Sequence, residues 1–276
     1  MDDSVGQVLA YALMVTRDLT MSCDAVHDAM AAASCLDATA SRRADLPWLL
    51  SLTRTECLRQ LRARGVFIDT ERPVLPSADP LDALTPGDRD ALVLMRRTDV
   101  DAVEAALAMG CSEGEARRRG DRAERMWSDA AALHALLTAH PPVCPVVSQV
   151  VAETSAVGGV LMPAARRRLQ RHAGTCGRCR PTFMPARSDS LELLDIPVRV
   201  PVPQHLEQRL QLTCDDPVRS AHLAERLGEL DRNGFPVPLD RADRDPAAWV
   251  RRGAIAAAFS AALLVVGLVA AALLSR

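Results

Sequence analysis

Several residue types are scarce or absent in this sequence of 276 residues, and each absence excludes something. There is no lysine, so all 33 basic residues are arginine, which together with the many alanines indicates a GC-rich genome more than a function. The formal net charge is only −2, so no overall positive field argues for nucleic-acid binding. Aromatic residues make up 3% of the chain, which favours small helical modules packed on leucine, valine and alanine. Because the first half also lacks β-branched runs, the sequence predicts a mainly α fold.

The motifs that usually carry catalysis are missing as well. The chain has no His-Glu-x-x-His motif, no glycine-rich loop to hold a phosphate and no nucleophile elbow. Cys176 and Cys179 have the spacing of a redox pair, but no βαβ pattern surrounds them. A catalytic zinc ion would need an open coordination position and a nearby general base. We therefore expect that the protein is not an enzyme.

The most informative pattern is His-x3-Cys-x2-Cys, formed by His172, Cys176 and Cys179. These positions are compatible with one face of a helix, at i, i+4 and i+7. A tetrahedral zinc ion takes four nitrogen or sulfur ligands, and three are present within eight residues. Cys144 is the expected fourth ligand, with His140 as an alternative. The sequence thus predicts a zinc site.

The remaining five cysteines stand alone, and we expect them to be small buried thiols. The chain begins without the pattern of a secretory signal peptide, which predicts a reducing compartment for all eight cysteines. The isolated cysteines are Cys23, Cys35, Cys57, Cys111 and Cys214.

Helical periodicity is visible in the first third of the chain. Apolar residues recur at helical spacing over residues 8–34, and a second helix is predicted over residues 47–64. Three prolines between residues 70 and 83 indicate a linker.

Residues 85–127 have the pattern of a helix-turn-helix. A first helix begins at Thr85-Pro86, a second covers residues 100–109 and ends at Gly110, and Ser112 caps a third. Arginine reaches phosphates and guanine edges through two parallel hydrogen bonds. The third helix carries five candidate DNA-binding arginines: Arg117, Arg118, Arg119, Arg122 and Arg125.

The C-terminal end contains 22 residues without a charge, residues 253–274. At about 1.5 Å per residue this segment is about 33 Å long, enough to cross a hydrocarbon core of about 30 Å. Arg251 and Arg252 precede it, so the positive-inside rule predicts a cytoplasmic N-terminal body. We expect a single membrane-spanning helix in the cell membrane.

Residues 84–127 resemble the promoter-recognising domain of the extracytoplasmic-function sigma factors of bacterial RNA polymerase. The resemblance includes residues 89–94, Glu104, Gly110 and Arg122. In that family this helix-turn-helix recognises the −35 promoter element.

The N-terminal part resembles the other conserved domain of these sigma factors. Residues 24–29 resemble the helix that binds polymerase, and residues 47–62 resemble the helix that contacts DNA. This resemblance implies binding to the polymerase core and to the −10 element of promoter DNA.

Cys144 with His172, Cys176 and Cys179 resembles the ligand pattern of the zinc-binding anti-sigma domains. In that family a small helical unit binds its sigma factor and holds it off polymerase, and a membrane span often follows. The resemblance implies an intramolecular or separate sigma or anti-sigma partner.

The order of these modules predicts a membrane-tethered, sigma-like regulator that a fused zinc-binding domain restrains in cis. The alternative is a membrane scaffold of anti-sigma type whose degenerate sigma domains no longer bind DNA. The predicted segments are a first sigma-like domain (1–67), a linker (68–83), a helix-turn-helix domain (84–139), a zinc-binding unit (140–182), a mostly extended proline-rich tether (183–248) and a membrane anchor (249–276).

Overall fold

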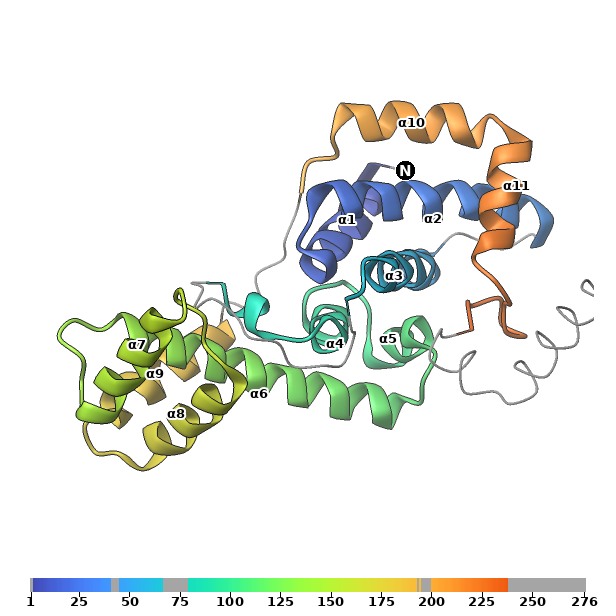
Figure 1. Ribbon diagram of the computed structural model, residues 1–276. Helices are drawn as coiled ribbons and strands as arrows, with labels where there is room; N and C mark the ends of the chain where they lie inside the picture. The colour runs from blue at the N-terminus through green and yellow to red at the C-terminus, as the bar shows by residue number, and fades with distance from the viewer. Residues whose placement is uncertain (1, 41–44, 67–78, 193, 195–199, 238–276) are drawn as a thin grey trace, which may run out of the picture. The chain divides into compact units, whose positions relative to one another are not determined.

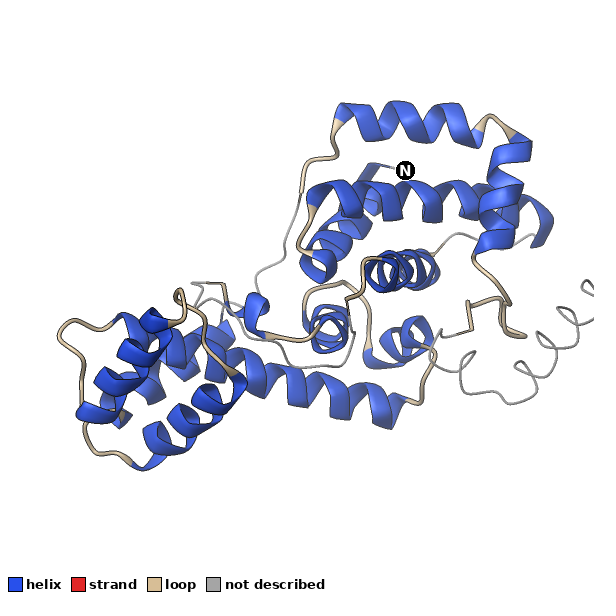
Figure 2. Cartoon of the chain, viewed as in Figure 1, coloured by secondary structure: helices blue, strands red, loops and turns tan. Residues whose placement is uncertain are grey.

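The computed structural model describes residues 2–40, 45–66, 79–192, 194 and 200–237. These residues form eleven α-helices and one short 3-10 helix. Figure 2 shows no β-strand among them. The expected mainly α fold is confirmed for this part of the chain. Within it, no helix is both long enough and apolar enough to span a membrane. The predicted span at residues 253–274 lies outside the described residues.

The N-terminal region consists of α1 (Asp2–Thr16), α2 (Leu19–Ala40) and α3 (Leu46–Ala63). The prediction of one helical run over residues 8–34 was wrong, because the chain breaks at Arg17, whose φ of 61° is left-handed. Asp18 then accepts a hydrogen bond from the backbone N–H of Met21 at 2.8 Å, which starts α2. The helix predicted over residues 47–64 is confirmed as α3 to within one residue at each end.

The three helices predicted after the linker are also confirmed. They are α4 (Pro86–Arg96), α5 (Ala102–Met109) and α6 (Glu113–Thr138), preceded by the 3-10 helix η1 (Pro80–Ala83). Thr85 and Ser112 cap α4 and α6, and Gly110 ends α5 in the left-handed conformation.

Gly120 explains how closely α6 approaches α4. A Cβ atom at this buried position would lie only 3.0 Å from Cγ of Met95 on α4. The glycine that should weaken the helix by about 1 kcal/mol therefore permits close packing between the two helices.

The next three helices are α7 (Pro145–Ala156), α8 (Pro163–Thr175) and α9 (Arg180–Glu192). They pack on the C-terminal half of α6, so that this helix belongs both to the group formed by α4, α5 and α6 and to the unit that follows. We call the C-terminal half of α6 together with α7, α8 and α9 the metal unit. Its buried apolar core includes Leu133 and Leu136 from α6, Val147 from α7 and Leu169 from α8.

The proline-rich region after residue 183 is mainly helical, so the prediction of a mostly extended tether was wrong for its described residues. Besides α9, it forms α10 (Gln204–Cys214) and α11 (Pro217–Arg226). The apolar spacing of residues 204–212 and 218–230 predicts one short helix at each of these places. Pro203 and Pro217 do not prevent this, because both stand where a helix begins, whereas Pro185 lies inside α9. Both helices pack against α2 (Figure 1).

The isolated cysteines differ in their exposure. Cys23 and Cys57 are buried, as expected, whereas Cys35 and Cys111 are only half-buried. The expectation was wrong for Cys214, which is exposed at the end of α10.

Candidate metal centre

The four predicted ligands come from three junctions of the metal unit. Cys144 is the residue that precedes α7, and His172 lies in the last turn of α8. Cys176 ends α8, and Cys179 lies in the turn before α9. The prediction that positions 172, 176 and 179 share one continuous helix was wrong, because α8 stops at Thr175.

The break after α8 allows both cysteines to face the same point. Cys176 has an extended backbone (φ −77°, ψ 119°), and the N–H of Cys179 donates to its carbonyl at 3.2 Å. A continuous helix would place Cys176 and Cys179 nearly a full turn apart along its axis. The turn brings their sulfur atoms together instead.

The ligand atoms lie at distances that suit a tetrahedral metal ion. One nitrogen and three sulfur atoms, from His172, Cys144, Cys176 and Cys179, all lie within 4.8 Å of one another. Sγ of Cys144 is 3.2 Å from Nε2 of His172 and 3.4 Å from Sγ of Cys179. In a tetrahedral zinc site the corresponding separations are about 3.5–3.8 Å. The residues therefore fit a metal ion after side-chain adjustments of up to about an ångström.

Burial and hydrogen bonding make the three thiols unequal. Backbone N–H groups of Cys179 and Arg178 face the sulfur of Cys176 and lower the pKa of that thiol. Burial, with the neighbouring sulfur atoms of Cys144 and Cys176, raises the pKa of Cys179 to about 12. Three crowded sulfur atoms are difficult to ionise together, and a bound cation would remove that difficulty.

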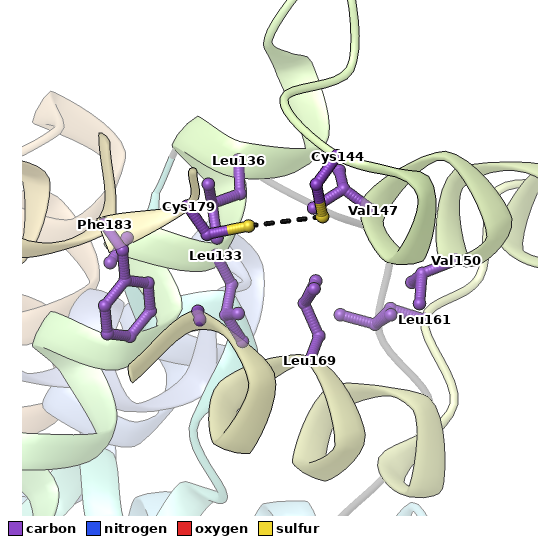
Figure 3. Packing of buried hydrophobic residues seen from close by; sticks show 11 residues of the cluster. Leu133, Leu136, Cys144, Val147, Val150, Leu161, Leu169, Cys179 and Phe183 are labelled. Atoms are coloured by element: carbon purple, nitrogen blue, oxygen red, sulfur yellow. Dashed lines mark hydrogen bonds between the residues drawn. The ribbon is translucent and has the colours of Figure 1, made fainter. Parts of the chain in front are cut away.

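The surroundings of the cluster are apolar. Figure 3 shows Cys144 and Cys179 among Leu133, Leu136 and Val147, with Phe183 beside Cys179. Four protein ligands leave no open position for a substrate, which is typical of a structural site.

The alternative ligand His140 is not part of the cluster. It is exposed, and its Nδ1 lies 2.9 Å from the carbonyl oxygen of Thr138. The fourth candidate ligand is therefore Cys144.

No family model, curated protein or solved structure matches this chain.

The candidate DNA-binding arginines lie in the N-terminal half of α6, and four of them pair with carboxylates. Arg117 bonds to Glu113, and Arg118 and Arg119 both bond to Glu115, all within the first turns of the helix. Arg122 bonds to Asp88 of α4 at 2.6 Å. Arg125 is exposed, as are Arg117, Arg118 and Arg122, whereas Arg119 is half-buried. The positive charge of this face is thus largely compensated.

A second group of contacts, which the sequence reasoning missed, covers one face of α2. We call residues 203–236, which include α10 and α11, the clasp. Arg209 of α10 donates to Asp24 at 2.9 Å, and Nε2 of His27 lies 3.0 Å from the hydroxyl of Thr213. Arg226 of α11 bonds to Asp28.

The clasp also reaches α3. Arg226 lies 3.4 Å from the buried carboxylate of Glu56, which Arg59 also contacts. The indole N–H of Trp48 donates to the carbonyl of Gly234 at 2.9 Å, and this leaves Trp48 only 3% exposed. The sequence signal that could have indicated these contacts is the amphipathic pattern of α10 and α11. The apolar face of each helix needs a partner to cover it.

Proposed function

We propose that this protein is a sigma-factor-like regulator of transcription initiation that its own C-terminal half restrains. The observation that carries this proposal is the position of the clasp. It pairs with Asp24, His27 and Asp28, within the segment that resembles the polymerase-binding helix of sigma factors. A polymerase core that bound this segment would first have to displace α10 and α11.

The covered surface extends to the segment that resembles a DNA-contacting helix. Trp48, the aromatic residue at the start of α3, is closed off by the chain around Gly234. In the restrained form, the clasp thus occupies parts of both surfaces that polymerase and promoter DNA would need.

The strength of the contacts suits a restraint that can be released. The Arg209–Asp24 pair is a little under half exposed on both sides, and such pairs contribute about 0–1 kcal/mol each. The pair between Arg226 and Asp28 is more buried. Several weak bonds together hold the clasp, yet a competing partner can replace them one at a time.

The metal unit stands between the helices α1–α5 and the clasp along the chain. Its core includes α6, and the clasp follows α9 along the chain. A zinc ion bound by Cys144, His172, Cys176 and Cys179 would join α7, α8 and α9 and supply structural stability. The uncharged segment at residues 253–274 would attach the whole assembly to the cell membrane, with the N-terminal body in the cytoplasm.

A second candidate function is supported by the arginine pairs on α6. Because Glu113, Glu115 and Asp88 already occupy four of the five arginines, phosphate contacts would have to compete with these carboxylates. This favours a scaffold of anti-sigma type whose sigma-like domains no longer bind DNA. Promoter binding by the released protein would contradict this alternative.

The test uses full-length protein in which both clasp arginines are replaced, Arg209→Ala with Arg226→Ala. These substitutions leave Asp24 and Asp28 intact on α2. We expect capture of polymerase core to increase at least about tenfold, the ratio expected when about 1.4 kcal/mol of restraint is lost. The matched control is Arg219→Ala, because this exposed arginine of α11 pairs locally with Asp216, the residue that caps the same helix. Equal capture by the double variant and the control would rule out the restraint.

A further inference from the structure

A buried polar triad joins the two regions that were predicted as separate sigma-like domains. The hydroxyl of Tyr11 on α1 donates to Oδ1 of Asp90 on α4 at 2.6 Å. The guanidinium of Arg54 on α3 donates to Oδ2 of the same carboxylate at 2.7 Å. Tyr11 is 0% and Asp90 2% exposed. One carboxylate of the helix-turn-helix region thus binds two side chains of the N-terminal region.

Two contacts nearer the surface support the same junction. Arg17, at the break between α1 and α2, pairs with Asp79 at 2.6 Å and with Asp82 at 2.9 Å. The amide of Gln7 on α1 donates to Asp99 at 3.2 Å. Together with the packing of α3 on α5 and of α1 on α4, these contacts join the two regions at several points.

The chemistry of the triad suits an interface that opens. An ion pair taken out of water gains little net stability over an apolar contact, because desolvation opposes the attraction between the charges. When the two regions separate, water can solvate Tyr11, Arg54 and Asp90, so opening leaves none of them buried without a partner. The paired state requires one arrangement of α1, α3 and α4, and so selects one closed geometry.

We propose, on the basis of the proposed function, that Tyr11, Arg54 and Asp90 form an interdomain lock that must open before both promoter elements can be contacted. Elements at −35 and −10 are about 25 base pairs apart, which is about 85 Å of B-form DNA. In the closed form, hydrogen bonds join the two regions directly. The lock is a second restraint, made of residues other than those that the clasp contacts.

Two native cysteines allow each restraint to be followed separately. Cys57 on α3 is fully buried, and burial together with the Asp90 carboxylate raises the pKa of its thiol. Cys23 on α2 lies near Arg209 of the clasp and is 2% exposed. Opening of the lock should expose Cys57, whereas release of the clasp should expose Cys23.

The experiment measures alkylation of each cysteine by N-ethylmaleimide in the folded, full-length protein, with mass spectrometry as the readout. Tyr11→Phe keeps the aromatic ring but removes the hydrogen bond to a charged acceptor. We expect the rate at Cys57 to rise at least about tenfold while the rate at Cys23 stays unchanged. Asp90→Asn should also raise the alkylation rate at Cys57. This second variant alters the packing of the triad in a different way.

The matched control is Ser22→Ala. It removes the buried hydrogen bond between the hydroxyl groups of Ser22 and Thr16, which are 2.7 Å apart and both belong to the N-terminal region. The rate at Cys57 should stay within about twofold of wild type. If Cys57 stays protected in Tyr11→Phe, or if Cys23 becomes reactive in parallel, the triad belongs to one inseparable core and the lock is overturned.

A second readout separates this inference from the proposed function. Occupancy of a DNA probe that carries both promoter elements is measured with polymerase core. Higher occupancy of the probe with Tyr11→Phe than with wild type supports the lock. A gain with the clasp variant alone overturns the role of the lock, and no gain with either variant overturns the proposed function itself.

Discussion

The metal unit and the clasp hold their parts of the protein in different ways. In the metal unit, four ligand atoms converge within 4.8 Å inside an apolar core. In the clasp, the contacts are spread over α2 and α3, and arginine–carboxylate pairs such as Arg209–Asp24 remain partly exposed. A metal site with four ligands is gained or lost as a unit, whereas separate ion pairs are lost one by one. The first arrangement suits a permanent structural element and the second a releasable restraint.

The largest effect should follow from removal of one metal ligand. Cys144→Ser replaces a soft thiolate ligand, and structural zinc sites contribute about 10–16 kcal/mol in small peptides. We expect loss of the bound metal and unfolding of α7 and α8, measured by elemental analysis and hydrogen exchange. The control is His140→Ala, which should keep one metal ion per chain. Unchanged metal content in Cys144→Ser would exclude the proposed ligand set.

An intermediate effect should follow from replacement of Trp48, which contacts the clasp, or of Trp127, which lies in the metal unit. Trp48 donates its indole N–H to Gly234 of the clasp, and Trp127 of α6 donates to the carbonyl of Ser190 on α9. Trp48→Phe and Trp127→Phe each remove one such hydrogen bond, at a cost of about 1 kcal/mol.

Hydrogen exchange should then locate the two losses in different places. Trp48→Phe should accelerate exchange about fivefold at residues 231–236 and leave α9 unchanged. Trp127→Phe should do the reverse. Acceleration of both regions by either substitution would mean that the clasp and the metal unit open together, and the contrast between them would fail.

The smallest effect should be a dependence of the clasp on pH. Burial by itself would raise the pKa of Asp28, but hydrogen bonds from His27 and Arg226 outweigh it and hold that pKa below its usual range. A carboxyl group with a lowered folded-state pKa contributes stability that is fully present above the unfolded value of about 3.9. That stability is lost as the pH falls through the lower, folded value.

The measurement compares free energies of unfolding for wild type and Asp28→Asn between pH 6 and pH 3. The advantage of wild type should shrink as the pH falls below about 4, since asparagine does not titrate. A difference that is independent of pH would show that Asp28 does not contribute through its charge.

Much of the fold could be predicted because its signals are local. Thr85, Gly110 and Ser112 begin or end helices through their own side chain or backbone, and the helices predicted from them are present. Arg17 was not foreseen, because a left-handed arginine has no sequence signature. The proline-rich region was misjudged, since Pro203 and Pro217 fit the start of a helix as well as they fit an extended chain.

The candidate metal ligands could also be predicted as a group, because their residue types and short spacing carry the information. His172, Cys176 and Cys179 lie within eight residues, and Cys144 is only 28 positions before His172. What spacing could not decide was the choice between Cys144 and His140, or the break that turns Cys176 and Cys179 toward one point. Both depend on how α7, α8 and α9 pack on α6.

The sequence by itself determined the helical class, several helix ends and the residues of the candidate metal site, because each depends on residues close together in the chain. Only the tertiary structure decided that the clasp covers α2, that Trp48 meets Gly234, and that Asp90 binds both Tyr11 and Arg54. The clasp contacts join residues 170–198 positions apart. Arginine and carboxylate residues are so common in this chain that no local pattern tells which of them will pair. That selection comes from the apolar packing that brings distant helices together.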